Sequence, residues 1–294
     1  MKISVIIPAH RAEATLPRTL RSLEAAAKDL DVETVVIEDA EGRGPSWARN
    51  RGLERATGDY VFFCDADDTV KADFFREPSA ALERTGADIC FFRYNGYPEI
   101  PAEELTGNQR IRDRYLPAYF GYSNDDIRRW NDGGDLYLRR EPGSVCRCAF
   151  RRAFIEANAI RFDESMTYFE DAAFLSHCVA FSERTVSVPS ELYEYAPRDD
   201  GNLATGWKSP RHWDYKFKVL EFRKRLDAAT DGQVWSYCEA SCVLAALEML
   251  KEHREGLSAY LADDRVRAAL RTFPISLRHP IALAAVLYLR WRTR

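Results

Sequence analysis

The sequence lacks the features that define several special classes of protein. No stretch approaches the ~20 consecutive apolar residues that a membrane-spanning helix needs. The seven cysteines are an odd number and include no Cys-x-x-Cys pair, which argues against a disulfide framework or a zinc site. No internal repeat or low-complexity tract is present. These absences favour a globular protein of a reducing, cytoplasmic compartment.

A strong charge of either sign is also missing. The 42 basic and 46 acidic residues leave a net charge of -4 over 294 residues. Binding to duplex nucleic acid needs a basic surface, so we expect no nucleic acid among the partners. A metal or an arginine can still hold one anionic ligand locally. The length suits one large domain, or a core with an appended subdomain.

The first hundred residues alternate apolar runs with helical patterns, and the first run is typical of a buried strand rather than a signal peptide. This alternation predicts βαβ units and an α/β fold with a mostly parallel sheet. Ligands bind such sheets beyond the carboxyl ends of the strands. The predicted strands are Ile3–Ile7, Val32–Ile37, Tyr60–Cys64 and Ala87–Phe92, with helices at Ala12–Lys28, Ser46–Ala56 and Val70–Arg84.

The rest of the chain is less regular until it becomes helical. The pattern is poor from Tyr94 to about Ser144, where one helix is expected at Arg110–Trp130. A domain boundary is expected near residue 205, with a helical subdomain at 206–294. The later predictions are helices at Arg151–Asn158 and Tyr168–Ser182, two short strands around Pro189 within Thr185–Tyr195, and helices at His212–Ala228, Gln233–His253, Leu257–Thr272 and Pro280–Arg292.

Polar clusters follow three of the predicted strands, at Pro8–Arg11, Glu38–Asp39 and Asp65–Asp68. Asp65 and Asp67 stand one residue apart after an apolar strand, so their carboxylates can meet around one cation. Hard oxygen ligands suit Mg²⁺ or Mn²⁺, and such a metal can neutralise a diphosphate. The plainer alternative is a helix N-cap with two solvated acids.

The segment Phe62–Thr69 also resembles the nucleophile strand of haloacid-dehalogenase-type phosphatases, where Asp65 would attack phosphate covalently. That family normally opens with this strand, whereas two predicted βα units precede it here. This position counts against a phosphatase, which is kept as an alternative. A non-catalytic nucleotide-binding protein is the other alternative.

The order of motifs over roughly residues 2 to 200 resembles inverting family 2 glycosyltransferases of the GT-A fold. Each motif alone is weak, but their order and spacing together are fairly specific. The matching segments are Ser4–Pro8, Val35–Asp39, Ala48–Leu53, Ala56–Val61, Asp65–Asp68, Phe169–Phe174 and Leu192–Tyr195.

The resemblance implies that a sugar moves from a nucleotide diphosphate donor to an acceptor hydroxyl. Asp171 would be the general base with Glu170 beside it, and a divalent cation, Mn²⁺ or Mg²⁺, would bind Asp65 and Asp67. Residues 1–94 would bind the nucleotide sugar and 95–205 the acceptor. The implied donor-binding residues are Pro8, Ala9, His10, Asp39, Arg49, Asp65, Ala66, Asp67 and Arg198.

Structural alternatives exist for these roles. Asp39 could cap a turn, Arg49 could pair with a surface acid, and Glu170 and Asp171 could balance a helix dipole. Many relatives carry Tyr-Asn where this chain has His10-Arg11. That difference puts the contacts to the nucleotide in question more than the fold.

A single-sugar transferase is the expected type of enzyme, because the Gln-x-x-Arg-Trp sequence of processive synthases is absent. UDP-sugar is the leading donor, since a carboxylate can accept the uracil imide hydrogen. The acceptor would be a glycan or a lipid-linked intermediate of cell-surface polysaccharide or lipopolysaccharide.

Two C-terminal segments leave a choice between membrane attachment and internal packing. His212–Leu226 is rich in aromatic and basic residues, and the apolar Ile281–Leu289 runs into Arg290-Trp291-Arg292. Such a combination suits peripheral contact with the anionic inner surface of a membrane. It equally suits a helical subdomain packed on the core.

Overall fold

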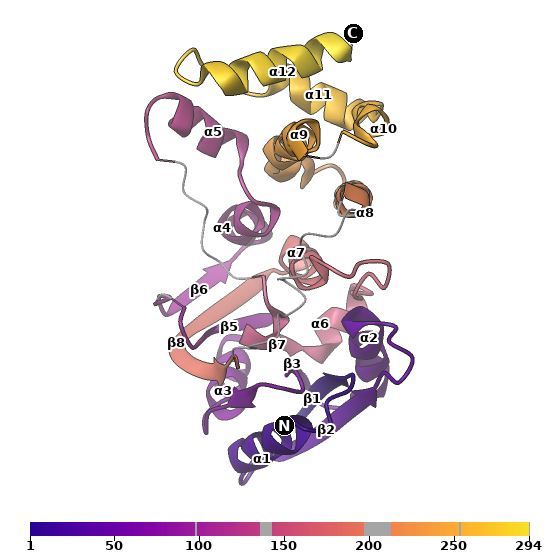
Figure 1. Cartoon of the computed structure of the whole chain (residues 1–294). Helices are drawn as coiled ribbons and strands as arrows, with labels where there is room; N and C mark the ends of the chain where they lie inside the picture. Colours follow the sequence, from indigo (N-terminus) through magenta and orange to yellow (C-terminus); the bar gives the residue numbers. More distant parts are fainter. Residues whose placement is uncertain (98, 136–142, 197–212, 253, 294) are drawn as a thin grey trace. The chain divides into compact units, whose positions relative to one another are not determined.

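The computed structural model describes residues 1–97, 99–135, 143–196, 213–252 and 254–293 (Figure 1). The chain divides into two units. The sheet unit comprises Met1–Ile111 and Gly143–Asn202, and the helical unit comprises Arg112–Pro142 and Leu203–Arg294. The segment 112–142, predicted to belong with the acceptor half, therefore groups with the C-terminal helices. The predicted boundary near 205 lies outside the described residues.

The sheet unit is built on one sheet, eight-stranded over the described residues, in the order β2-β1-β3-β7-β5-β8-β4, with β6 paired to β8. Parallel pairing joins β1 to β2 and β3, and β5 to β8, while β7 runs antiparallel between β3 and β5. Hence β1, β2, β3, β5 and β8 all run in one direction, and the predicted α/β fold with a mostly parallel sheet is confirmed. The strands are β1 Lys2–Ala9, β2 Asp31–Glu38, β3 Tyr60–Phe63, β4 Thr69–Val70, β5 Ile89–Tyr94, β6 Glu103–Thr106, β7 Cys148–Arg151 and β8 Arg184–Glu194.

Neighbouring phenylalanines of β3 build the core on the two faces of the sheet. Phe62 packs against Phe74 and Phe75, with ring centroids 5.2 Å away in both cases. Phe63 points to the other face, where it meets Phe162 at 5.4 Å and Phe174 at 5.9 Å. This face also carries the helices that hold the polar groups described below. The helices of this unit are α1 Leu16–Ala26, α2 Pro45–Arg55, α3 Arg76–Thr85, α6 Arg152–Ala157 and α7 Glu170–Phe181, with the short 3₁₀ turn η1 Val145–Arg147 and the start of α4 Asn108–Phe120.

Three local predictions were wrong in ways that have physical reasons. The helix predicted from Val70 begins only at Arg76, because Thr69 and Val70 form β4 against β8. The segment Cys148–Arg151, with no strand predicted, is buried between β3 and β5. Four residues that run directly into a helix give little periodicity to detect. Around Pro189 the structure has one strand with irregular register instead of two strands.

Two predicted helices are each divided in the helical unit. Gly121, with φ of 96°, and the N-cap Ser123 separate α4 from α5 Asn124–Asn131. Asp263 accepts from the backbone N–H groups of Arg265 and Val266, which ends α10 Leu257–Leu261 and starts α11 Asp264–Thr272. A left-handed glycine and an Asp cap are common reasons for a helix to stop and restart.

The helical unit has its own apolar core around α9 Trp235–Glu252. Its described C-terminal part is entirely helical, as predicted, and adds α8 Trp213–Ala229 and α12 Pro280–Arg292. Among the described residues, no helix has both the length and the apolar character needed to cross a bilayer. The core side chains include Ile127, Leu220, Val243, Ala246, Met249, Tyr260, Leu270, Val286 and Leu289.

Gly52 lets α2 approach β1 closely. A Cβ atom at Gly52 would lie 2.2 Å from Cγ2 of Ile6. Glycine-to-alanine changes inside a helix normally stabilise by about 1 kcal/mol. We predict that Gly52→Ala instead lowers the free energy of unfolding by about 1–3 kcal/mol, because it overpacks this contact. Urea denaturation measures the change.

A double-mutant cycle with Ile6→Ala provides the control, since this change removes both γ carbons of Ile6. The cost of Gly52→Ala should shrink in that background, with a coupling of about 0.5–3 kcal/mol. Equal costs in both backgrounds would show that the close approach to Ile6 is not the reason for the glycine.

Candidate active site

The carboxyl ends of β1, β2 and β3 meet at one edge of the sheet, as parallel pairing requires. His10 follows β1, Asp39 follows β2, and Asp65 follows β3 by two residues. Helix α7 and the turn η1 bring further polar groups to this edge. Of the three predicted strand-end clusters, the one that contains Asp65 meets residues of α7 through Arg49.

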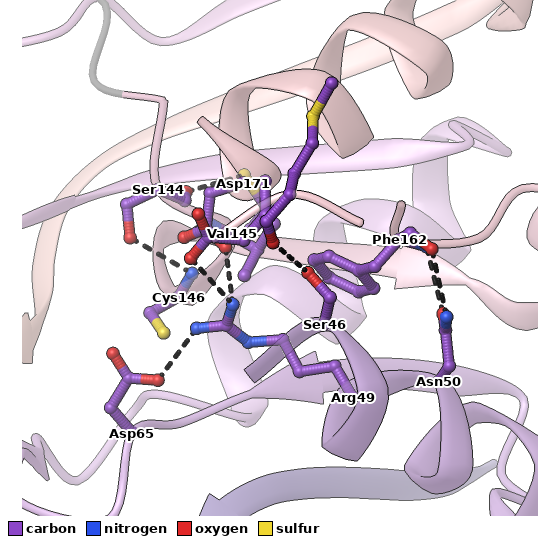
Figure 2. Close-up of polar contacts among 12 residues, drawn as sticks. Ser46, Arg49, Asn50, Asp65, Ser144, Val145, Cys146, Phe162 and Asp171 are labelled. Carbon is purple, nitrogen blue, oxygen red and sulfur yellow. Dashed lines mark hydrogen bonds and ion pairs between the residues drawn. The ribbon is translucent and has the colours of Figure 1, made fainter. Parts of the chain in front are cut away.

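A buried arginine joins the groups at this edge (Figure 2). Arg49 of α2 is 3% exposed. Its Nη1 lies 2.7 Å from Oδ1 of Asp171 and 3.6 Å from Oε1 of Glu170, and its Nη2 lies 3.0 Å from Oδ1 of Asp65. We call these four residues the Arg49 cluster. The alternative that Arg49 pairs with a surface acid is wrong, because the guanidinium is buried among these carboxylates.

Helix α2 carries Arg49 to this position through a turn that Asp39 stabilises. Oδ1 of Asp39 accepts from N–H of Arg43 at 2.9 Å, and Oδ2 accepts from N–H of Gly44 at 2.7 Å. Gly44, with φ of 101°, then leads into Pro45 at the first position of α2. Burial alone would raise the pKa of Asp39, but the N–H groups of Arg43 and Gly44 lower it. Asp39 thus has the turn-capping role that the sequence left as an alternative.

The segment before α7 is fixed to α2 by hydrogen bonds of Asn50. Its Nδ2 donates to the carbonyl of Phe162 at 3.0 Å and to Glu164 at 2.9 Å, and its Oδ1 accepts from N–H of Phe162 at 2.9 Å. Phe169, with φ of 68°, then turns the chain into α7. Asn50 was not predicted as a site residue, although it stands next to Arg49 in the same motif.

The start of α7 is also positioned from η1. N–H of Val145 donates to Oδ2 of Asp171 at 3.2 Å. At Gly143 a Cβ atom would lie 2.8 Å from Cβ of Ala172, so a larger residue would press on α7 at this point. A backbone donor of this kind carries no side-chain signal, so sequence reasoning could not find it.

Burial and crowding raise the pKa values of the carboxyls around Arg49. Burial, and then the charge of Asp171, raise the pKa of Glu170 to about 7. Burial also raises the pKa of Asp171, which the positive charge of Arg49 opposes. Three carboxyls share one guanidinium, so full ionisation leaves an excess of negative charge. The site therefore favours either a proton or an added cation.

Asp68 ties the end of β3 to β8. It is 1% exposed and accepts from the hydroxyl of Tyr193 at 2.5 Å and from N–H of Ala196 at 2.8 Å. The Tyr193 hydroxyl in turn accepts from N–H of Asp65 at 3.1 Å. Burial, and then the charge of Asp65, raise the pKa of Asp68 to about 7. Tyr193 therefore positions Asp65, a role that the sequence did not predict.

Helix α1 also holds the loop Asp65–Asp68 by hydrogen bonds. Oγ1 of Thr19 donates to the carbonyls of Ala66 at 3.0 Å and Asp68 at 2.8 Å, and Arg18 donates to the carbonyl of Asp67. With its backbone bound at these points, the loop presents Asp65 and Asp67 as half-buried carboxylates.

The donor set fits a hard divalent cation in part. Asp65 and Asp67 supply carboxylate oxygens, the ligands that Mg²⁺ and Mn²⁺ prefer. Among the described residues, no group of three or more His, Cys, Asp or Glu side chains is arranged to hold a metal. A cation bound here would therefore complete its coordination with phosphate oxygens and water, as Mg²⁺ commonly does.

Three other predicted donor-binding residues lie at the end of β1, where it runs beside β2. Nδ1 of His10 is 2.6 Å from the carbonyl oxygen of Asp39. Pro8 and Ala9 are the last residues of β1, in register with Ile37 and Glu38 of β2. Arg198 lies outside the described residues.

Comparison with known proteins gives one family match and distant relatives. The model of glycosyl transferase family 2 matches residues 26–135. The succinoglycan biosynthesis protein ExoO of Rhizobium meliloti is 24% identical over 95% of this chain and 85% of its own length. The poly(ribitol-phosphate) beta-N-acetylglucosaminyltransferase TarS of Staphylococcus aureus is 22% identical over 71% of this chain. The match covers only 38% of the length of TarS.

The fold of the chain is also similar to that of a solved structure. A crystal structure of S. aureus TarS residues 1–349 in complex with UDP-GlcNAc superposes with a TM-score of 0.61. The superposition covers 100% of this chain and 88% of the TarS fragment at 18% sequence identity. The likeness identifies the sheet unit and its flanking helices as a GT-A fold.

Arg49→Met should destabilise the protein strongly and in a pH-dependent way. Removing one partner of a buried ion pair costs about 3–5 kcal/mol. Glu170 has a folded pKa raised to about 7, so its contribution to stability is present below its ordinary pKa of 4.5 and is lost as the pH rises through 7. Without Arg49 this effect should grow. We predict that the free energy of unfolding falls by the full amount of about 3–5 kcal/mol near pH 8 and by less near pH 5, measured by urea denaturation.

Arg51→Met is the matched control, because the Arg51 side chain is 40% exposed and pairs with Glu54 at the surface. Its cost should stay below about 1 kcal/mol at both pH values. A loss from Arg49→Met that is the same near pH 5 and near pH 8 would contradict the assignment of charge to this cluster.

Proposed function

We propose that the chain is a glycosyltransferase of family 2, whose model matches residues 26–135, and that it moves a single sugar from a UDP-sugar to an acceptor hydroxyl, with inversion at the anomeric carbon. The observation that carries this proposal is the Arg49 cluster. It joins Asp65, at the end of β3, to Asp171, at the start of α7, through one buried guanidinium. The carboxylate of Asp65, on the side of the donor, and the carboxylate of Asp171, proposed as the general base, are thus held at one edge of the sheet.

Asp171 is the general base that takes the proton from the acceptor hydroxyl. Oδ1 contacts Arg49 and Oδ2 accepts from N–H of Val145, so the side chain is fixed in orientation. A base must be ionised, and the charge of Arg49 favours the ionised form. Glu170, whose pKa is raised to about 7, can carry a proton near neutral pH and so leave the negative charge on Asp171.

Arg49 acts as a positioning residue. It fixes the distance between the carboxylate beside the donor and the carboxylate that activates the acceptor. Attack at the anomeric carbon needs the acceptor oxygen and the leaving diphosphate on opposite sides, so this separation matters for the rate. The buried guanidinium also keeps Asp65 and Asp171 from repelling each other.

Asp65 and Asp67 would hold Mn²⁺ or Mg²⁺ together with the donor diphosphate. When bound, such a cation supplies positive charge against the negative charge that develops on the leaving nucleotide. The excess of carboxylates over guanidinium in the cluster supports this assignment. Thr19 fixes the backbone of Ala66, which lies between the two aspartates.

The nucleotide would lie along the ends of β1 and β2, beside Pro8, Ala9, His10 and Asp39. Asp39 is 4% exposed, and its oxygens already accept from Arg43 and Gly44. Its main contribution is therefore to shape the turn that receives the base, and any contact to the uracil imide uses a remaining lone pair. The TarS fragment that shares the fold was solved with UDP-GlcNAc, which supports a uridine donor. Arg198 remains a candidate for the diphosphate.

The acceptor is proposed to be a growing cell-surface glycan or its lipid-linked precursor. The relatives support this class, since ExoO is named for succinoglycan biosynthesis and TarS for glycosylation of poly(ribitol-phosphate). A cytoplasmic location, at the inner face of a membrane when the acceptor is lipid-linked, is part of this proposal.

Asp171→Asn should abolish transfer while keeping donor binding. Loss of a general base typically lowers the rate by about 10²–10⁴-fold. We expect the dissociation constant for UDP to change only slightly, because the amide oxygen of the substituted side chain can still accept from Arg49. Release of UDP from a UDP-sugar in the presence of acceptor measures turnover, and calorimetry measures binding.

Glu170→Gln is the isosteric neighbour control and should retain most of the turnover. Normal transfer by Asp171→Asn, combined with loss in Glu170→Gln, would move the role of base to Glu170. Full activity in both variants would remove the base from this helix.

Donor binding should depend on a divalent cation and on the Asp65–Asp67 pair. We predict that UDP and UDP-sugars raise the melting temperature when Mn²⁺ is present and have little effect in EDTA. A ligand at 100 times its dissociation constant stabilises the folded state by about 2.7 kcal/mol, which such a scan resolves. The double change Asp65→Asn/Asp67→Asn should abolish the Mn²⁺-dependent part.

Other nucleotides serve as controls in the same scan. A larger shift with GDP or ADP than with UDP would overturn the choice of uridine. An equal shift with and without Mn²⁺ would overturn the role given to the cation.

A further inference from the structure

The large apolar side chains left exposed by the fold gather near the C-terminal end of the described chain. Leu277 and Ile281 are each 86% exposed, and Trp291 is 68% exposed. Ile275, Leu287 and Tyr288 are also exposed. Over the rest of the described residues, the exposed large apolar side chains are Met1 and Tyr195. Contiguous exposed apolar surface commonly marks an interaction site.

Helix α12 has one apolar face inside the protein and a second one outside. Val286 and Leu289 are fully buried in the core of the helical unit. At 100° per residue, Ile281, Ala284 and Leu287 fall on the opposite side of the helix from them. A helix that is apolar all round is normally buried all round. We call the α12 face the exposed outer residues Ile281, Ala284, Leu287, Tyr288 and Trp291, together with the exposed Leu277 just before the helix.

The sequence that forms this face carries only positively charged side chains. From Arg265 to Arg294 the sequence has seven arginines and no aspartate or glutamate, although the whole chain has a net charge of -4. Arg278 and Arg292 are exposed and adjoin Leu277 and Trp291 of the α12 face in the sequence. They donate to the carbonyl of Asp132 and to the hydroxyl of Ser258, both of which are neutral groups. Within the part of the chain that the structure describes, their charges are not neutralised by an ion pair.

We propose that the α12 face docks on an anionic lipid surface, with Arg278 and Arg292 contacting the headgroups. Apolar side chains would enter the boundary between headgroups and acyl chains, where tyrosine and tryptophan are favoured. Each arginine near such a surface strengthens binding.

The charges argue against a second copy of the chain as the occupant. A symmetric dimer built on the α12 face would bring the arginines of both copies into one interface, where like charges repel. An anionic bilayer instead offers both an apolar interior and negative headgroups.

Helix α8, the other segment with aromatic and basic residues, does not contribute to this surface. Its Val219, Leu220, Phe222 and Leu226 are buried. Lys216 is also buried and is paired with Glu248 at 2.6 Å. The two alternatives left by the sequence are thus divided between segments, because α8 packs internally and α12 supplies the exposed face.

The lipid surface and the transfer reaction can be tested separately. The α12 face belongs to the helical unit, whereas Arg49, Asp65 and Asp171 belong to the sheet unit. A variant of the α12 face should keep its Mn²⁺-dependent response to UDP. Loss of that response in the wild type would count against the proposed function and not against lipid docking.

Co-sedimentation of the full chain with vesicles tests the proposal. Wild type should sediment with vesicles of phosphatidylcholine and phosphatidylglycerol in equal parts, and remain in solution with phosphatidylcholine alone. Arg278→Gln/Arg292→Gln should lower the partition coefficient about 30-fold, which is about fivefold for each arginine. Leu277→Gln/Ile281→Gln/Trp291→Gln should lower it about tenfold for each side chain that leaves the interface.

Arg21→Gln/Arg55→Gln is the charge-matched control. Both arginines are exposed in the sheet unit, and binding should stay within about twofold of wild type. Hydrogen exchange on the wild type is a second measurement that needs no variant, and it should show residues 275–292 protected when anionic vesicles are added.

Three results would overturn the proposal. The first is no sedimentation with anionic vesicles, and the second is equal loss in the control pair. The third is a wild-type oligomer that the triple variant converts to a monomer without any effect of lipid, which would assign the face to a second copy of the chain.

Discussion

The ion cluster around Arg49 is the interaction on which the candidate site depends. A guanidinium that is 3% exposed needs charged partners, because an isolated buried charge is very costly. Its partners come from the end of β3 and the start of α7, more than a hundred residues apart in the sequence. The cluster therefore forms only when β3, α2 and α7 have all reached their places on the sheet. Folding and assembly of the site are the same event for these residues.

The same cluster sets the electrostatics of the edge. Three carboxyls facing one guanidinium are stable only if some of the negative charge is removed, and the raised pKa of Glu170 is one sign of this imbalance. A proton can relieve it in the free protein, and a cation carried in with a diphosphate can relieve it in the complex. The excess negative charge of the free site therefore favours binding of the cation that the proposed reaction requires.

Much of this arrangement was predictable from the sequence, and the remainder was not for identifiable reasons. The first three parallel strands and the place of Asp65 and Asp171 followed from apolar runs, turn residues and motif order. The strand Cys148–Arg151 did not, because its identity comes from the neighbours β3 and β5 and not from its own pattern. Arg49 was assigned to the donor, whereas its guanidinium is bound by Asp65 and Asp171. Asp39 and Tyr193 act through backbone partners, which leave no trace in side-chain spacing.

The orientation of helix α12 also could not be predicted from its sequence. Its sequence is apolar on every side, so periodicity alone cannot say which face is buried. Only the packing of Val286 and Leu289 in the helical core identifies the outer face as the one left over. The net charge of the whole chain also hides the local positive charge, because the last thirty residues of this mildly acidic sequence contain no aspartate or glutamate. An exposed apolar stripe beside unneutralised arginines is unfavourable in water alone and favourable at an anionic bilayer. The physical reason to expect a lipid surface is therefore the combination of these two local properties, neither of which is visible in the composition as a whole.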